Sequence, residues 1–160
     1  MDEKENMLPE HLPIFQKGAE IMDVVHRICE LIPEENDMLM EVKSMMIFDA
    51  AQLTIKVAGA EAAELYDLKM EEATIVRKSA MDLMVQKHAL KMHGFEQVVY
   101  FDTVGELIEE YRILFIDWVK GFDQWDYVID RWGLFNPPGV DPFYKDPDED
   151  IPFDPSDLLS

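Results

Sequence analysis

The chain lacks the residue types that stabilise small secreted folds or build loop-based phosphate sites. Its single cysteine, Cys29, excludes an internal disulfide framework and fits a reducing compartment. Its seven glycines are isolated from one another, so they cannot form a glycine-rich phosphate-binding loop. Strand-like alternation and Asn-Gly hairpin signals are also missing. These absences argue against disulfide-stabilised, phosphate-loop and β-rich proteins.

Proline is absent from residues 34–136, a stretch of 103 residues. The nine prolines all lie before or after this stretch, and six of them follow residue 136. The stretch between them is rich in Met, Leu, Ala and Glu, which favour helices, whereas proline breaks them. We therefore predict an all-α protein.

Basic residues are scarce: 14 Lys and Arg stand against 34 Asp and Glu, for a net charge of −20. Residues 37–94 are close to balanced, and the acidic excess lies on both sides of them. Such a surface repels phosphate backbones, which argues against a nucleic acid ligand. Two interpretations of the acidity stay open: attraction of a basic protein partner, or simple solubility.

Targeting signals are missing too. The chain opens Met1-Asp2-Glu3-Lys4-Glu5, with no basic-then-apolar signal peptide. No stretch approaches the ~20 uncharged apolar residues of a membrane span. We expect a soluble cytoplasmic protein with no membrane partner.

Apolar residues spaced three and four apart predict four helices. The first runs over 13–32 and the second starts at Asn36 or Asp37. A turn between residues 59 and 68 leads to the third, which ends at Gly94. The fourth starts at Thr103, whose spacing to Glu106 is typical of a capping box. Short connections between four such helices predict an antiparallel four-helix bundle.

The apolar residues of each predicted helix form one stripe, here called its seam. The seam of the fourth helix continues through Trp118, Trp125 and Trp132, which are seven residues apart. Gly121 followed by Asp123 could end the helix there and start a short fifth one. The spacing of the apolar residues continues unchanged across Gly121, which equally favours one helix over 104–132. We predict a flexible N-terminus (1–12), a helical bundle (13–133) and an acidic, proline-rich tail (134–160).

No catalytic, cofactor-binding or metal-binding motif is present. Asp23 and His26 form only half of a carboxylate–histidine pattern, and His88 and His93 are five residues apart, a poor spacing for one metal. Cys29 fits a small buried hydrophobe better than a nucleophile. Arg77 and Arg112, each beside a seam, could pair with Asp49 or Glu72 or lie solvated along apolar surface.

The tail interleaves aromatic residues with prolines and acids, so it cannot form its own core. Three interpretations stay open: an arm that folds back over the Trp-rich end of the bundle, a linear motif that binds another protein, or a solubilising segment. Under the first two, the seam beyond Trp118 is a docking surface. The candidate partner-binding residues are Trp125, Trp132, Phe135, Phe143, Tyr144 and Phe153.

Several short patterns also occur in known proteins. The opening Ile14, Phe15, Lys17 and Ala19, the helix end Ile32-Pro33, and the step Ala58-Gly59-Ala60 are of this kind. On these residues the chain from Ile14 to about Asp123 resembles the four-helix-bundle proteins encoded in intervening sequences of 23S ribosomal RNA genes. That resemblance implies a bundle that forms rings or other homo-oligomers, and it carries no catalytic residues. On residues 129–139 the whole chain also resembles a group of small acidic proteins of the Bacteroidota.

Together these patterns predict a non-enzymatic bundle that acts through protein–protein interaction, either with itself or with a basic partner. A bundle that binds a small ligand or a metal between its methionine-rich helices is the first alternative. RNA association through the balanced central segment is the second.

Overall fold

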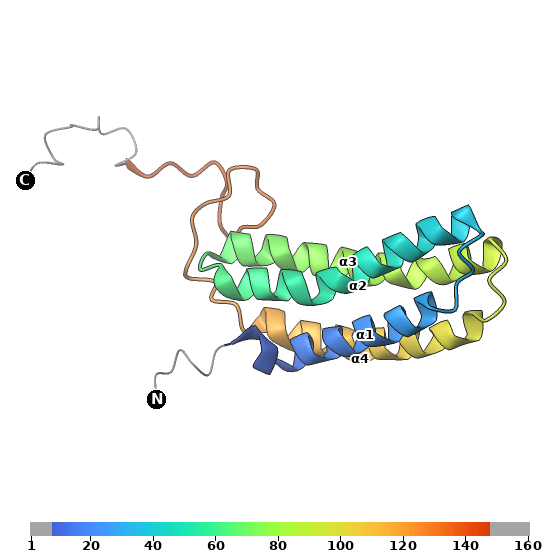
Figure 1. The fold of residues 1–160 in the computed structure, drawn as a ribbon. Coiled ribbons are helices and arrows are strands. Elements are labelled where there is room, and N and C mark those ends of the chain that lie inside the picture. The colour runs from blue at the N-terminus through green and yellow to red at the C-terminus, as the bar shows by residue number, and fades with distance from the viewer. Residues whose placement is uncertain (1–7, 148–160) are drawn as a thin grey trace, which may run out of the picture.

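The structure is a computed structural model that describes residues 8–147. These residues fold into a bundle of four antiparallel helices (Figure 1). The elements, in chain order, are η2 (Pro9–His11), α1 (Pro13–Cys29), α2 (Asp37–Ala62), α3 (Tyr66–Met92), η3 (Val98–Tyr100) and α4 (Phe101–Lys120). In Figure 1 α2 and α3 lie side by side above the pair formed by α1 and α4. The all-α fold and the four-helix bundle are confirmed, and residues 8–147 contain no strand.

The core is built from the seams that the spacing predicts. Ile21 on α1, Leu53 on α2, Val76 on α3 and Val104 on α4 are all fully buried. The buried Tyr111 donates its hydroxyl to the carbonyl oxygen of Leu53 at 2.8 Å. No helix within the described range is long and apolar enough to cross a membrane.

Two predicted helix ends are confirmed by their hydrogen bonds. The Asn36 side chain accepts from the backbone N–H of Leu39 at 3.1 Å and so caps the N-terminus of α2. Gly94 follows α3 with a φ of +88°, and the N–H of Phe95 reaches back to the Leu90 carbonyl at 2.9 Å. This is the Schellman arrangement, which favours glycine because other residues pay a steric cost at positive φ. The turn between α2 and α3 also falls in the predicted interval.

Two other helix boundaries were predicted wrongly. α1 ends at Cys29 rather than Ile32, because Pro33 disfavours helical backbone in the residue before it. The N–H groups of Leu31 and Ile32 instead donate to carbonyls three residues back, as in a 3₁₀ turn. α4 begins at Phe101, two residues before Thr103, and it has no side-chain cap. Burial of the Phe101 ring and the preceding η3 turn fix this start instead of a capping box.

The long aromatic seam is interrupted at Gly121, where α4 ends. Backbone N–H groups of Gly121 and Phe122 close the last turn on Trp118 and Val119. Residues 121–147, here called the C-terminal loop, contain no α-helix, so the structure has neither a 104–132 helix nor a short fifth one in this range. The heptad spacing of Trp125 and Trp132 therefore does not put them on the stripe that carries Trp118.

Candidate functional site

The C-terminal loop starts from a buried anchor. Phe122 packs into a small cluster at the end of the bundle, with the Trp118 ring edge-on at a centroid distance of 4.9 Å. The ammonium of Lys69 lies 5.7 Å from the centre of the same Phe122 ring. Trp118 is fixed in turn, because its indole N–H donates to a Glu61 carboxylate oxygen at 2.7 Å. The loop thus leaves the bundle from a defined position.

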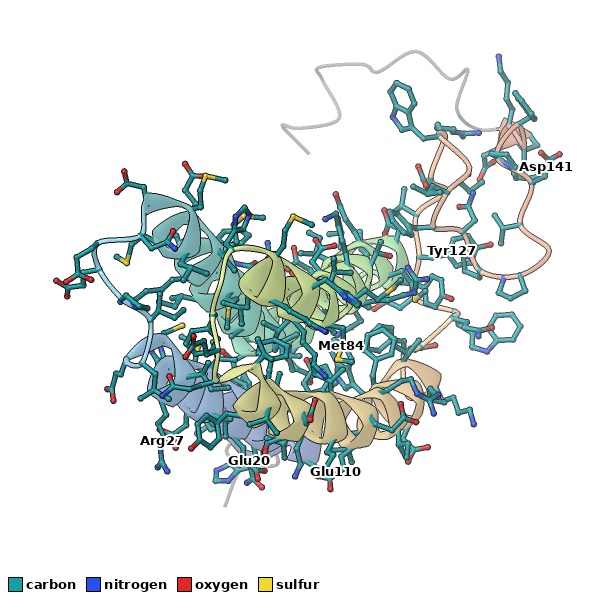
Figure 2. All side chains as sticks on the ribbon, turned by 90° about the vertical axis from the view of Figure 1, so that its right-hand side faces the viewer. Glu20, Arg27, Met84, Glu110, Tyr127 and Asp141 are labelled. Carbon is teal, nitrogen blue, oxygen red and sulfur yellow. The ribbon has the colours of Figure 1, made fainter. Side chains whose placement is uncertain are left out.

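The next residues attach the loop to the start of α3. The backbone N–H of Tyr66 has no partner within its own helix, and it donates to the carbonyl oxygen of Asp126 at 2.8 Å. Asp123 accepts from the backbone N–H of Trp125 at 2.9 Å, which is the hydrogen bond of an Asx turn. Figure 2 shows Tyr127 where the loop passes the bundle and Asp141 at the far edge of the loop.

Asp130 organises the middle of the loop. Its carboxylate accepts three backbone N–H groups, from Trp132 at 3.0 Å, Leu134 at 2.9 Å and Phe135 at 2.8 Å. These N–H groups, the one from Phe135 first, hold the pKa of Asp130 below its ordinary value because they favour the ionised form. Gly133, at a φ of +71°, gives the backbone the bend that lets all three point at one carboxylate.

Two further side chains close the loop on itself. Asn136 accepts from the backbone N–H of Asp130 at 2.7 Å and donates to the carbonyl of the same residue at 2.9 Å. The Arg131 guanidinium donates to the carbonyl oxygens of Pro142 and Tyr144. The loop is therefore held by specific hydrogen bonds although it has no regular secondary structure.

This held backbone displays aromatic rings to solvent. Trp125 is 90% exposed, Trp132 is 96% exposed and Phe143 is 87% exposed. Tyr144 is exposed as well, and Phe135 is partly buried. Phe153, the sixth predicted partner-binding residue, lies outside the described residues. The loop brings the other five into one segment but gives them different environments.

Within the described part of the chain the tail leaves Trp125 and Trp132 uncovered, and residues 148–160, which complete the predicted arm, lie outside the described residues. Trp125, Trp132 and Phe143 do not pack on the bundle; Phe122 occupies the position at the bundle's end. The reason is local, because the turns at Asp123 and Asp130 direct the backbone by side-chain hydrogen bonds, without contact between these rings and the core.

A small acidic pocket lies where the loop meets α3. It has a volume of about 230 Å³ and is lined by Asp67 and Glu71 of α3 and by Asp130, Trp132, Leu134 and Phe135 of the loop. One carboxylate oxygen of Asp67, Oδ1, is buried and makes no hydrogen bond with residues 8–147. The three carboxylates of its lining favour a ligand that carries positive charge.

Two larger grooves follow the helices. One, of about 560 Å³, lies between α2 and α3 and is lined in part by Phe48, Asp49 and Val85. The other, of about 510 Å³, lies between α3 and α4, which contact each other less than α2 and α3 do. Figure 2 shows Met84 in this second groove, between the α3 and α4 ribbons.

Asp49 is a buried acid on the first groove. It is 7% exposed, and no hydrogen bond or ion pair to it is found among the described residues. Burial, with a smaller contribution from Asp82, raises the pKa of Asp49 to about 6, and Lys78 opposes this rise. Of the two interpretations of Arg77 and Arg112, pairing with Asp49 or Glu72 is not seen among the described residues: Arg112 pairs with Glu109, and Lys56 pairs with Glu72.

The candidate nucleophile and metal ligands stay apart. Cys29 is buried, and burial raises the pKa of its thiol to about 11, which disfavours the reactive thiolate. Within residues 8–147, no three His, Cys, Asp or Glu side chains gather in a way that could hold a metal ion.

Comparison of the chain with protein-family models, curated proteins and solved structures finds no match. The resemblances to intervening-sequence proteins and to small acidic Bacteroidota proteins stay predictions. Function therefore has to be argued from the site.

Sequence reasoning did not single out Asp49 and Asp67 as site residues. The sequence does set Asp49 apart, because it is the only acidic residue between Glu41 and Glu61. It does not set Asp67 apart: this residue stands near the start of a helix, where acids are ordinary, and only the fold of the C-terminal loop closes a pocket over it.

Proposed function

We propose that this chain is a non-enzymatic helical bundle that binds a basic protein partner through the C-terminal loop. The observation that carries the proposal is that Trp125 and Trp132 are 90% and 96% exposed on a backbone fixed by the Asp123 and Asp130 hydrogen bonds. Tryptophan is enriched among the residues that dominate binding energy at interfaces. A ring displayed on a fixed loop also loses little conformational freedom when it binds.

The charge of the site supports a basic partner. The pocket beside Trp132 contains the carboxylates of Asp67, Glu71 and Asp130, and the net charge of the chain is −20. A lysine or arginine side chain can pair with these carboxylates while its stem packs on the indole of Trp132. Complementary charge of this kind speeds encounter and disfavours acidic partners.

Capture experiments with matched variants test the proposal. The full chain, W125A/W132A and M92A are each used as bait, followed by quantitative mass spectrometry. Met92 is an exposed apolar residue at the other end of α3, so M92A controls for loss of surface apolar area. We expect wild type and M92A to recover a basic protein that W125A/W132A recovers at least ~30-fold less well, since one such anchor is worth ~2 kcal/mol or more.

Two outcomes would contradict the proposal. The first is equal recovery of every bound protein by W125A/W132A and wild type. The second is recovery that does not fall with rising salt, because attraction between an acidic and a basic surface is screened by ions. Light scattering on the same proteins separates self-association from partner binding, since a wild-type oligomer that W125A/W132A dissociates would identify a second copy as the partner.

The groove between α3 and α4 favours a second candidate function, binding of a small amphipathic anion. Its walls include Met81, Met84 and Ile116, and Arg77 stands at its edge without an ion pair among the described residues. The fluorescence of the probe 1-anilinonaphthalene-8-sulfonate should rise with wild type and less with R77Q, and R27Q on α1 serves as control. An equal rise with all three proteins would remove this candidate.

A further inference from the structure

Helix α2 carries apolar residues on two of its faces. The inner face packs in the core, whereas Met38, Met45, Phe48 and Ile55 are large and exposed. Their separations of seven, three and seven residues place them along one stripe of the helix surface. The stripe covers about 26 Å at ~1.5 Å per residue, which is the length of a partner helix of about five turns.

The groove between α2 and α3 lies at the centre of this stripe. Met45 and Phe48 form its α2 side and Val85 lies on its α3 side, and all three side chains are exposed, Phe48 to 63%. The groove follows two adjacent antiparallel helices. Its apolar rim and its direction match the mode in which an amphipathic helix lies in a groove.

The same groove contains a carboxylate that lacks a partner. Asp49 lines it, is 7% exposed and makes neither a hydrogen bond nor an ion pair within the described part of the chain. The nearby Lys78 pairs instead with Asp82, one turn further along α3. Asp49 is largely buried, yet it lines a groove that is open to solvent, so a cation that enters the groove can form a charge-assisted hydrogen bond with its carboxylate.

We propose that the α2/α3 groove is a second docking surface, which binds an amphipathic helix of a partner protein and pairs one arginine or lysine of that helix with Asp49. A small amine bound in the groove would pair with Asp49 but would leave the exposed apolar stripe uncovered. A helix also accounts for the exposed stripe from Met38 to Ile55. The surface is separate from the C-terminal loop and does not depend on the function proposed for the loop.

A designed peptide pair tests the charge. The probe is an amidated 18-residue amphipathic helix with a leucine face, a neutral glutamine face and one arginine at the centre of the leucine face. Its twin carries citrulline, which has the same shape and no charge. Binding to the full chain is followed by the methyl signal of Met45 in ¹³C-methyl-methionine spectra, which reports on the groove itself.

We expect the arginine peptide to bind wild type at least ~10-fold more tightly than the citrulline peptide, the usual range for a hydrogen-bonded charge. D49N should remove this preference, and D117N, an equal charge change on an exposed part of α4, should keep it. F48A should weaken both peptides, whereas W125A/W132A should bind both as wild type does. Because Phe48 is exposed, F48A tests the groove without disturbing the core.

Four results with the peptides would overturn the proposal. They are equal affinity of wild type for the two peptides, an arginine preference that survives in D49N, F48A binding as tightly as wild type, and no shift of the Met45 signal at millimolar peptide. A concentration-dependent shift of Met45 without peptide would overturn it as well, by showing that a second copy covers the groove.

Discussion

Replacement of Asp49 by asparagine should stabilise this protein, although most substitutions of buried residues destabilise. Burial raises the pKa of Asp49 from an ordinary 3.8 to about 6. In the folded state the carboxyl group therefore holds its proton to higher pH than in the unfolded state. The free energy of unfolding then falls as pH rises from about 4 to about 6, because the unfolded chain ionises first. Above that window the carboxylate is charged in both states, and the loss of stability is complete.

The pKa difference sets the size of the effect. A rise from 3.8 to about 6 corresponds to an upper value of about 3 kcal/mol at pH 8. The groove beside Asp49 is open to solvent, which screens part of this penalty, so we expect D49N to be more stable than wild type by about 2 kcal/mol at pH 8. At pH 5 the folded carboxyl group is largely protonated, and the advantage of D49N should shrink by about 1 kcal/mol.

Urea unfolding followed by far-UV circular dichroism at pH 5, 6, 7 and 8 measures this directly. At pH 8 the midpoint of D49N should lie about 1 M above that of wild type, for a slope of ~2 kcal/mol/M. D117N should stay within about 0.5 kcal/mol of wild type throughout, as expected for an exposed residue. A D49N variant that is less stable than wild type, or a gap that does not change with pH, would refute the description of Asp49 as a buried carboxylate without a partner.

Three further outcomes follow from individual contacts. G18A should lower the free energy of unfolding by about 1–3 kcal/mol in thermal melts, because its Cβ would lie 2.9 Å from the Leu53 carbonyl oxygen on α2; an unchanged melting temperature would contradict this close approach. Y111F removes the hydroxyl that donates to the same carbonyl and should cost about 1 kcal/mol in urea titrations, whereas a neutral effect would mean that the hydroxyl makes no net contribution. D130A should speed hydrogen exchange of the three loop amides that it binds while leaving the helices protected, and unchanged exchange in the loop would show that other contacts hold it.

The bundle was predictable because its seams are strongly periodic. Ile21, Leu53 and Val76 each lie where a period of 3.6 puts them, and burial of one stripe per helix leaves few other folds. Helix ends were predicted well where one side chain or one backbone conformation decides them, as at Asn36 and Gly94. They were predicted poorly where packing decides, as at Phe101.

The candidate site was predictable as a segment but not as a geometry. The aromatic residues of the loop stand out in the sequence, yet their heptad spacing also fitted a helix that the chain does not form beyond Lys120. Hydrogen bonds that the Asp123 and Asp130 carboxylates accept from backbone N–H groups compete with helical ones there, and the spacing of apolar residues does not reveal them. The exposed apolar stripe of α2, from Met38 to Ile55, was not predicted. When a helix is apolar on two faces, the spacing of its residues does not reveal that one of these faces stays exposed.

The proposed binding surface requires a C-terminal loop whose backbone is fixed while it exposes the indoles of Trp125 and Trp132. Backbone ¹⁵N relaxation of the full-length protein measures this property. We expect order parameters of about 0.85 for the amides of both tryptophans, equal to those of α3. Values below about 0.6 at these two amides would contradict it, because the rings would then sit on a flexible segment and not on a preorganised binding surface.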